Sequence, residues 1–94
     1  MIDLSGKKVL ITGGSRGIGR ATALMFAKAG ADAAITYQRQ EKAALEVKGA
    51  VEALGRQCLA AKVEISNQVD VKRAVDEIIR AWGRLDILVN NAGI

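Results

Sequence analysis

The sequence predicts an α/β fold in which a parallel sheet carries helices on both faces, built in the order βαβαβαβ. Three observations support this prediction. Short apolar runs alternate with segments of helical periodicity, the connections between them are short, and a glycine follows each helical segment. Strands that alternate with helices form parallel sheets, because each helix returns the chain to the end of the sheet where the next strand begins.

The first strand and helix are expected at the N-terminal end of the chain. Lys8–Thr12 is a β-branched apolar run, which is typical of a strand buried on both faces. Residues 17–29 follow with helical spacing, and Gly30 is well placed to end that helix. The face expected to point inward consists of Ile18, Ala21, Thr22, Met25 and Ala29.

The second unit repeats this form. Residues 33–37 read as a strand, weakened by its alanines, and residues 41–54 read as a helix that Gly55 ends. Gly49 inside this helix lowers the stability of the helix by about 1 kcal/mol relative to alanine. The only explanation that we can suggest from the sequence is that the helix packs closely on the sheet at this position. The expected inward residues are Ala43, Val47, Ala50, Val51 and Leu54.

The third unit contains the most clearly amphipathic helix. Residues 57–65 are expected to form a strand and residues 67–81 a helix, with Asn67 as its N-cap. Gly83 ends this helix, and residues 85–89 form a fourth strand. The apolar face consists of Val71, Ala74, Val75, Ile78 and Trp82, and the opposite face is charged.

A glycine-rich segment joins the first strand to the first helix. Residues 12–19 read Thr-Gly-Gly-Ser-Arg-Gly-Ile-Gly, a G-x-x-x-G-x-G variant of the dinucleotide-binding fingerprint. Glycines let the backbone approach a diphosphate, and the N–H groups at the positive end of the helix then bind the anion. A tight turn with close helix–strand contact is the alternative. The flanking strand and helix favour phosphate binding, and hence a Rossmann-like sheet of order 3-2-1-4.

The end of the second strand indicates which dinucleotide fits. An acidic residue there would bind the adenosine ribose 2′-hydroxyl and repel a 2′-phosphate, which selects NAD. Here Tyr37, Gln38 and Arg39 follow instead, with no acid before Glu41, and Arg16 in the glycine loop is a second cation. Two guanidinium groups around a phosphate favour NADP over NAD. The alternative is that both arginines are solvated surface residues.

Two motifs together carry a family resemblance. The glycine segment 12–19 and the Asn-Asn-Ala-Gly turn at 90–93 resemble the motifs of the short-chain dehydrogenase/reductase family, and the similarity runs from end to end. Within the family the chain is most similar to the 3-oxoacyl-[acyl-carrier-protein] reductases. The implied cofactor is NADP, with NAD less favoured.

The resemblance also implies residue roles. The loop would bind the phosphates, Arg39 would face the 2′-phosphate, and Asn91 would line the ribose pocket. Glu64 stands where the family usually has aspartate beside the adenine amino group, and the backbone of Ile65 is a further adenine contact. The implied cofactor-binding residues are Gly13, Ser15, Arg16, Gly17, Ile18, Gly19, Tyr37, Arg39, Glu64, Ile65, Asn91, Ala92 and Gly93.

The catalytic residues of the family have no counterpart in the sequence. The family transfers a hydride between nicotinamide and a carbonyl or alcohol carbon, with a tyrosine as proton donor, a lysine four residues later and an earlier serine. The only tyrosine is Tyr37, and position 41 is Glu41. We therefore expect residues 1–94 to be the N-terminal dinucleotide-binding part of a longer NADP-dependent oxidoreductase, and to be inactive alone. The substrate of the whole enzyme is expected to be a small carbonyl or alcohol compound, and a 3-oxoacyl thioester is the first guess.

The composition of the chain narrows the classes of protein to which it could belong. The net charge is +4, but the basic residues are scattered and no aromatic series accompanies them, which argues against nucleic-acid binding. No apolar run could span a membrane, no signal peptide is evident, and no histidine is present, so we expect a cytoplasmic protein without a metal site. Cys58 is expected in the core. The whole enzyme is expected to be a homo-oligomer, from the family. The main alternative to an enzyme is a non-catalytic dinucleotide-binding module. A weaker alternative is an interaction protein that dimerises through its apolar edge strand.

Overall fold

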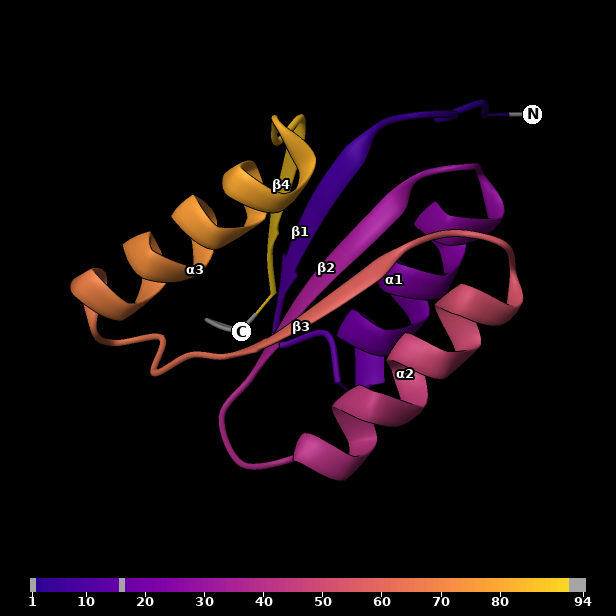
Figure 1. Ribbon diagram of the computed structural model, residues 1–94. Helices are drawn as coiled ribbons and strands as arrows, with labels where there is room; N and C mark the ends of the chain where they lie inside the picture. Colours follow the sequence, from indigo (N-terminus) through magenta and orange to yellow (C-terminus); the bar gives the residue numbers. More distant parts are fainter. Residues whose placement is uncertain (1, 16, 92–94) are drawn as a thin grey trace.

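The computed structural model describes residues 2–15 and 17–91, and within them strands and helices alternate as expected (Figure 1). The helices end within a residue or two of the expected positions, and the third strand is shorter than expected. The elements are β1 (Lys8–Thr12), α1 (Gly17–Lys28), β2 (Asp32–Tyr37), α2 (Glu41–Ala53), β3 (Cys58–Lys62), α3 (Gln68–Trp82) and β4 (Ile87–Asn90).

The strands form one parallel sheet in the order β3-β2-β1-β4, which confirms the predicted topology. In the register of this sheet, Val9 of β1 lies opposite Ala33 of β2 on one side and Ile87 of β4 on the other. Because all strands run the same way, their carboxyl ends meet at one edge of the sheet. The segments that follow β1, β2, β3 and β4 are thereby brought together.

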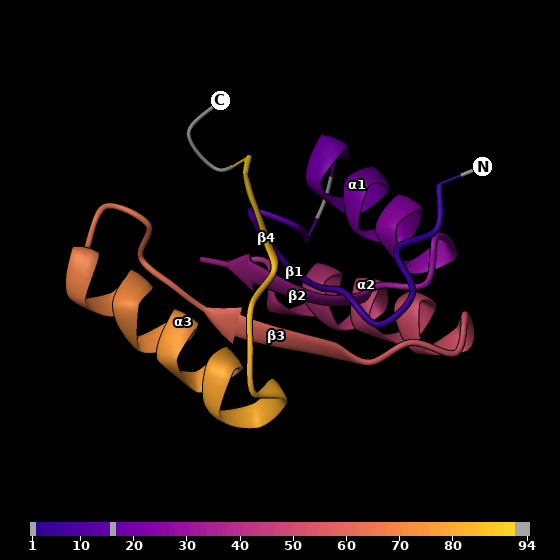
Figure 2. The same ribbon diagram turned by 90° about the horizontal axis from the view of Figure 1, so that it is seen from above.

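Helices cover both faces of the sheet, as predicted (Figures 1 and 2). Helices α1 and α2 pack on one face and α3 on the other. Alternate residues of the strands fill the two cores: Val9 and Ile11 lie with Ile35 in the larger one, whereas Leu10 packs with Ala34 and Ile78 in the smaller one. Strands buried on both faces explain why β1 and β2 read as continuous apolar runs.

The face of α1 that packs on the sheet differs from the prediction. Its buried residues are Gly19, Ala23 and Ala27, whereas Ile18 is 69% exposed and Met25 is 61% exposed. The expectation that Ile18, Ala21, Thr22, Met25 and Ala29 point inward was therefore wrong. Small side chains let the helix lie close to the sheet, and this close approach selects glycine and alanine over larger apolar residues.

Two expectations for α2 were also wrong. Val47 and Val51 are buried as predicted, but Leu54 is 42% exposed because the helix ends one residue before it. Gly49 is exposed, and a Cβ added there would meet no atom within 4 Å. Close packing on the sheet is therefore not the reason for this glycine, and nothing in the structure explains it.

Helix α3 has the predicted caps. The Asn67 side chain accepts hydrogen bonds from the N–H groups of Val69 (3.0 Å) and Asp70 (3.2 Å). At the other end Gly83 has a φ of 83°, a conformation that costs other residues energy, and its N–H donates to the Ile79 carbonyl at 2.7 Å. These caps fix where α3 begins and ends.

Strand β4 lies at the edge of the sheet and pairs, within the described residues, with β1 alone. Leu88 in the middle of this strand is 61% exposed. Within the described residues, the outer edge of β4 is therefore without a neighbouring strand. Among the described residues no helix is both long and apolar enough to cross a membrane.

The single cysteine lies in the larger core. Cys58, at the start of β3, is 3% exposed, and burial raises the pKa of its thiol to about 11. The Lys48 charge opposes this rise in the pKa, and the Glu52 charge adds to it by a smaller amount; both effects are included in that value. A thiol that stays protonated is a poor nucleophile, so the structure confirms Cys58 as a core residue.

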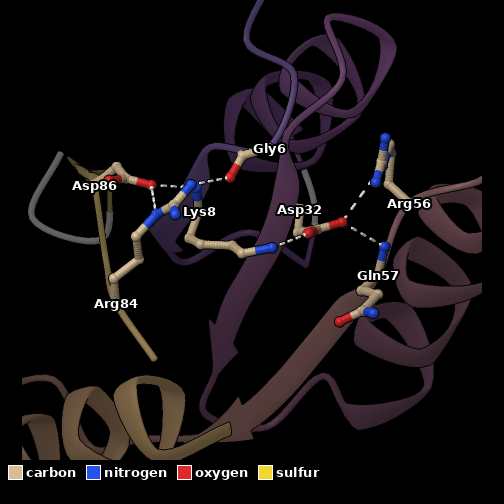
Figure 3. A network of polar contacts seen from close by, with 7 residues as sticks. All are labelled: Gly6, Lys8, Asp32, Arg56, Gln57, Arg84 and Asp86. Carbon is tan, nitrogen blue, oxygen red and sulfur yellow. Dashed lines mark hydrogen bonds and ion pairs between the residues drawn. The ribbon is translucent and has the colours of Figure 1, made fainter. Parts of the chain in front are cut away.

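The amino ends of the strands are joined by ion pairs and hydrogen bonds (Figure 3). The Asp32 carboxylate is 2% exposed and contacts the Lys8 ammonium, the Arg56 Nε at 3.4 Å and the Gln57 N–H at 2.8 Å. Burial by itself raises the pKa of Asp32, but the hydrogen bonds from Lys8 and Gln57 and the two positive charges outweigh it and lower the pKa. The buried carboxylate therefore stays ionised.

A second acidic residue ties β4 to β1 at the same end. Asp86 accepts the Lys8 N–H at 2.8 Å and the Arg84 Nε at 3.0 Å, while Arg84 also donates to the Gly6 carbonyl (Figure 3). These hydrogen bonds, from the Lys8 N–H first and Arg84 second, lower the pKa of Asp86. We call Lys8, Asp32, Arg56, Gln57, Arg84 and Asp86 the amino-end network.

Candidate functional site

A cavity of about 740 Å³ lies at the opposite edge, where the strands end. It is formed by the loop after β1, by the end of β2 and the segment after it, and by the residues that follow β3 and β4. Its lining residues are Gly13, Ser15, Gly17, Thr36, Tyr37, Gln38, Arg39, Gln40, Val63, Ile65 and Asn91. The sheet order reverses at β1, between β2 and β4, which is where open parallel sheets bind ligands.

The backbone of Gly13 is held from both neighbouring strands. Its N–H donates to the Thr36 Oγ1 of β2 at 3.0 Å, and its carbonyl accepts from the Asn91 Nδ2 beyond β4 at 3.2 Å. Gly13 has a φ of 68°, which glycine adopts without strain. The start of the loop is therefore fixed in a conformation that places Gly13 and Ser15 on the cavity wall.

Gly19 lies beneath the same loop, in the first turn of α1. A Cβ at this position would lie 2.1 Å from the Gly13 carbonyl oxygen and 2.7 Å from the Asn91 Nδ2. Only glycine fits there. The helix can therefore begin directly under the loop, as close helix–strand packing requires.

The start of α1 supplies the groups that an anion needs. Gly17, the first residue of the helix, lines the cavity. The first N–H groups of a helix have no partner within it, and they carry the positive end of the helix dipole. No acidic residue stands in the first turn of α1 to neutralise that end. This wall of the cavity therefore has the chemistry that an anion-binding site requires.

Thr12 joins the ends of β1 and β4. Its hydroxyl accepts the Asn91 N–H at 2.9 Å and lies 3.1 Å from the Asn90 Oδ1. Asn90 and Asn91, the first two residues of the Asn-Asn-Ala-Gly turn, therefore pack beside Thr12. Arg16, Ala92 and Gly93, which the resemblance also implies, lie outside the described residues.

The end of β2 forms the cationic rim of the cavity. Tyr37 is half-buried and donates to the Glu41 Oε2 at 3.3 Å; burial raises the pKa of its hydroxyl, and the Glu41 charge raises it further. Arg39 is exposed, and among the ion pairs within residues 2–15 and 17–91 none includes it. No described residue lining the cavity is acidic. An anion at this rim would meet an unpaired guanidinium group.

Glu64 and Ile65, after β3, lie differently. Ile65 lines the cavity, whereas the exposed Glu64 carboxylate accepts from the Gln38 Nε2 at 2.6 Å and the Ser66 hydroxyl at 3.0 Å. Glu64 lines a second hollow of about 550 Å³, which also includes Gln38 and Asp70. Asp70 accepts the Glu64 N–H at 2.6 Å, and this bond and Arg73 lower the pKa of Asp70.

The structure brings most of the described candidates together. Those on the cavity wall are Gly13, Ser15, Gly17, Tyr37, Arg39, Ile65 and Asn91. Ile18, Gly19 and Glu64 are not on it. Sequence reasoning did not assign a role to Thr36, Gln38, Gln40 or Val63, which also line it. Gln38 and Gln40 flank Arg39, so their position next to a candidate residue could have indicated that they line the cavity. Thr36, by contrast, has the sequence context of an ordinary strand residue.

Comparison with known proteins agrees with this geometry. Residues 7–94 match the family model described as short chain dehydrogenase. The chain is 43% identical over 93 residues to hydroxynaphthalene reductase arp2 of Aspergillus fumigatus, covering 99% of this chain and 34% of that protein. It is 40% identical over 91 residues to an L-rhamnose 1-dehydrogenase (NAD(P)(+)) of Sphingomonas sp. (strain SKA58), covering 97% and 36%.

A solved structure is similar over nearly the whole chain. A short-chain dehydrogenase from Burkholderia cenocepacia J2315, solved in complex with NADP, superposes with a TM-score of 0.94 at 52% identity, over 97% of this chain and 37% of that one. The chain thus spans about a third of the length of the proteins it matches. On the family match over residues 7–94, the chain belongs to the short-chain dehydrogenase family.

Proposed function

We propose that residues 1–94 are the N-terminal, dinucleotide-binding part of an NADP-dependent oxidoreductase. The cavity at the carboxyl ends of the strands carries this proposal. It combines a glycine loop at a helix start with Arg39, which has no ion pair within the described residues, and no described lining residue is acidic. A dinucleotide with one phosphate more than NAD matches that distribution of charge.

The chain's own residues fit such a ligand in a definite arrangement. Gly13, Ser15 and Gly17 line the wall where the diphosphate would lie, because the first N–H groups of α1 are there. Arg39 would face the 2′-phosphate, with Arg16 as the second cation that the sequence suggests. When bound, the nicotinamide cofactor supplies or accepts the hydride. The NADP complex of the similar Burkholderia protein supports this cofactor.

We propose that the whole enzyme interconverts a carbonyl and an alcohol. The similar proteins include a hydroxynaphthalene reductase and an L-rhamnose 1-dehydrogenase, whose names describe reactions of this class. A 3-oxoacyl thioester is the first substrate to test. The proton donor is proposed to lie beyond position 94 of a longer, homo-oligomeric gene product, because Tyr37 is engaged by Glu41 and position 41 is not lysine.

A titration of the full-length gene product with NADPH and NADH tests the cofactor. We expect NADPH to bind more tightly, and Arg39→Ala to weaken NADPH about tenfold while leaving NADH unchanged, because one charged hydrogen bond is worth about that much. Arg16→Ala should act in the same direction. Arg80→Ala is the matched control, since Arg80 is exposed on α3, away from the residues that line the cavity.

Equal affinities for the two dinucleotides, unchanged in the Arg16 and Arg39 variants, would rule out the NADP assignment. The reading frame beyond codon 94 tests the enzyme assignment separately. A serine followed by Tyr-x-x-x-Lys supports the oxidoreductase. NADPH binding without turnover by a gene product that lacks that motif would favour the non-catalytic module instead.

A further inference from the structure

We infer that Thr36 is a positioning residue for the phosphate-binding loop. Its hydroxyl fixes the Gly13 peptide, and thereby directs the rest of the loop toward the cavity. The inference rests on the proposed function, because it concerns how the loop meets a diphosphate. Thr36 is the next-to-last residue of β2, is 4% exposed and lines the cavity.

Thr36 accepts hydrogen bonds from two successive loop residues. The Gly13 N–H donates to the Thr36 Oγ1 at 3.0 Å, and the Gly14 N–H donates to the Thr36 carbonyl at 3.2 Å. Any residue at position 36 supplies the carbonyl. The first bond needs a hydroxyl oxygen, so it depends on the identity of the side chain.

The Gly13 carbonyl, which belongs to the next peptide group of the chain, is also held. Asn91 Nδ2 donates to the Gly13 carbonyl at 3.2 Å, and Gly19 leaves room for that carbonyl because a Cβ there would lie 2.1 Å from its oxygen. The carbonyl is thus engaged beneath the loop. A bound phosphate would be repelled by a carbonyl oxygen that turned toward it, so this orientation favours the anion.

Removal of the Thr36 hydroxyl breaks one side of this arrangement. The half-buried Gly13 N–H would lose its acceptor where β2 packs against the loop, and an N–H left without a partner there costs free energy. The peptide would turn to recover a partner and shift Ser15 and Gly17, the next loop residues on the cavity wall. Affinity for the diphosphate should fall, whereas the adenosine end, formed by other residues, should be unaffected.

The experiment separates these two ends with two ligands. We would measure the binding of NADPH and of adenosine 2′-monophosphate, which lacks the diphosphate, to the full-length gene product and its variants. Thr36→Val keeps the side-chain volume without the acceptor, and we expect it to weaken NADPH about tenfold and to leave adenosine 2′-monophosphate unchanged. Thr36→Ser keeps the hydroxyl and should bind both ligands within about twofold of the wild type.

Three outcomes overturn the inference. Unchanged NADPH affinity in Thr36→Val would show that the hydroxyl does not set the loop. Equal loss of both ligands would show a general structural role. If Thr36→Val does not fold, Thr36→Ala is compared with Thr36→Ser, and equal NADPH affinity in that pair also overturns it. A wild-type protein that binds neither NADPH nor NADH would contradict the proposed function itself, which distinguishes the two failures.

Discussion

The two ends of the sheet are built on opposite principles. At the amino end, the buried Asp32 carboxylate forms ion pairs with Lys8 and Arg56 and accepts the Gln57 N–H, so its charge is paired within the protein. At the carboxyl end, a cavity of about 740 Å³ is lined by glycine backbone and by Arg39, which has no ion pair within the described residues.

The contrast shows where stability and binding reside in this chain. Groups that are paired within the protein stabilise it and have little left to offer a ligand. Groups left unpaired contribute less to folding and are available for binding. Mutations at the two ends should therefore separate: the amino end should change the free energy of unfolding, and the carboxyl end should change cofactor affinity.

The largest effect is expected from Gly19→Ala at the carboxyl end. The new Cβ would lie 2.1 Å from the backbone oxygen of Gly13, which no side-chain rotation relieves. The loop must move by about an ångström, and such a displacement costs on the order of a hundredfold in function. Titration with NADPH measures it, and wild-type affinity in the folded variant would contradict the arrangement of this loop.

The next largest effect is expected from Asp32→Ala at the amino end. It leaves the Lys8 ammonium and the Gln57 N–H without their buried partner, and should lower the free energy of unfolding by about 2 kcal/mol. Denaturant unfolding measures this loss. NADPH affinity of the folded variant should stay at the wild-type value, and a joint loss of affinity would break the separation between the two ends.

A smaller effect is expected in the acid range. The pKa of Asp32 is lowered in the folded protein, so its stabilisation is fully present above the ordinary aspartate value of about 3.9. It is lost as the pH falls through the lowered pKa, because the unfolded chain then binds the proton more readily. Asp32→Asn should flatten this part of the curve of unfolding free energy against pH. Curves of the same shape for both proteins would mean that folding does not lower the pKa of Asp32.

The smallest effect is expected from Gly49→Ala, which belongs to neither end. Gly49 is exposed inside α2, and its added Cβ would meet no atom within 4 Å. The free energy of unfolding should rise by up to about 1 kcal/mol, because alanine favours helix, with NADPH affinity unchanged. This variant is the matched control for Gly19→Ala, and a decrease in its stability would indicate a role for the glycine that packing does not show.

The order of elements could be predicted because it depends on local patterns. Continuous apolar runs marked β1 and β2, and Asn67 and Gly83 marked the ends of α3. The face of α1 could not be predicted this way. Hydrophobicity favoured Ile18 and Met25, but the distance between helix and sheet admits only Gly19, Ala23 and Ala27. That distance is set by tertiary packing, which no local pattern contains.

The candidate site also contains some residues that local sequence patterns could predict and others that they could not. The glycine loop and Arg39 could be found from motif and charge, whereas Thr36 could not, because its partner Gly13 lies 23 residues away. The amino-end network was also missed. Asp32 precedes the strand predicted at residues 33–37, and nothing near it in sequence indicates that Lys8 lies beside it in the sheet.

The bond between Asp86 and Lys8 has a consequence for how the chain assembles. It joins residues 78 apart, and β4 is the neighbour that completes the second edge of β1. Of the four described strands β1 is synthesised first, yet its second edge stays without this partner until β4, Ile87–Asn90, has been synthesised. Non-local pairings of this kind slow folding, so the pairing of β1 with β4 is expected to be a late step in the formation of this sheet.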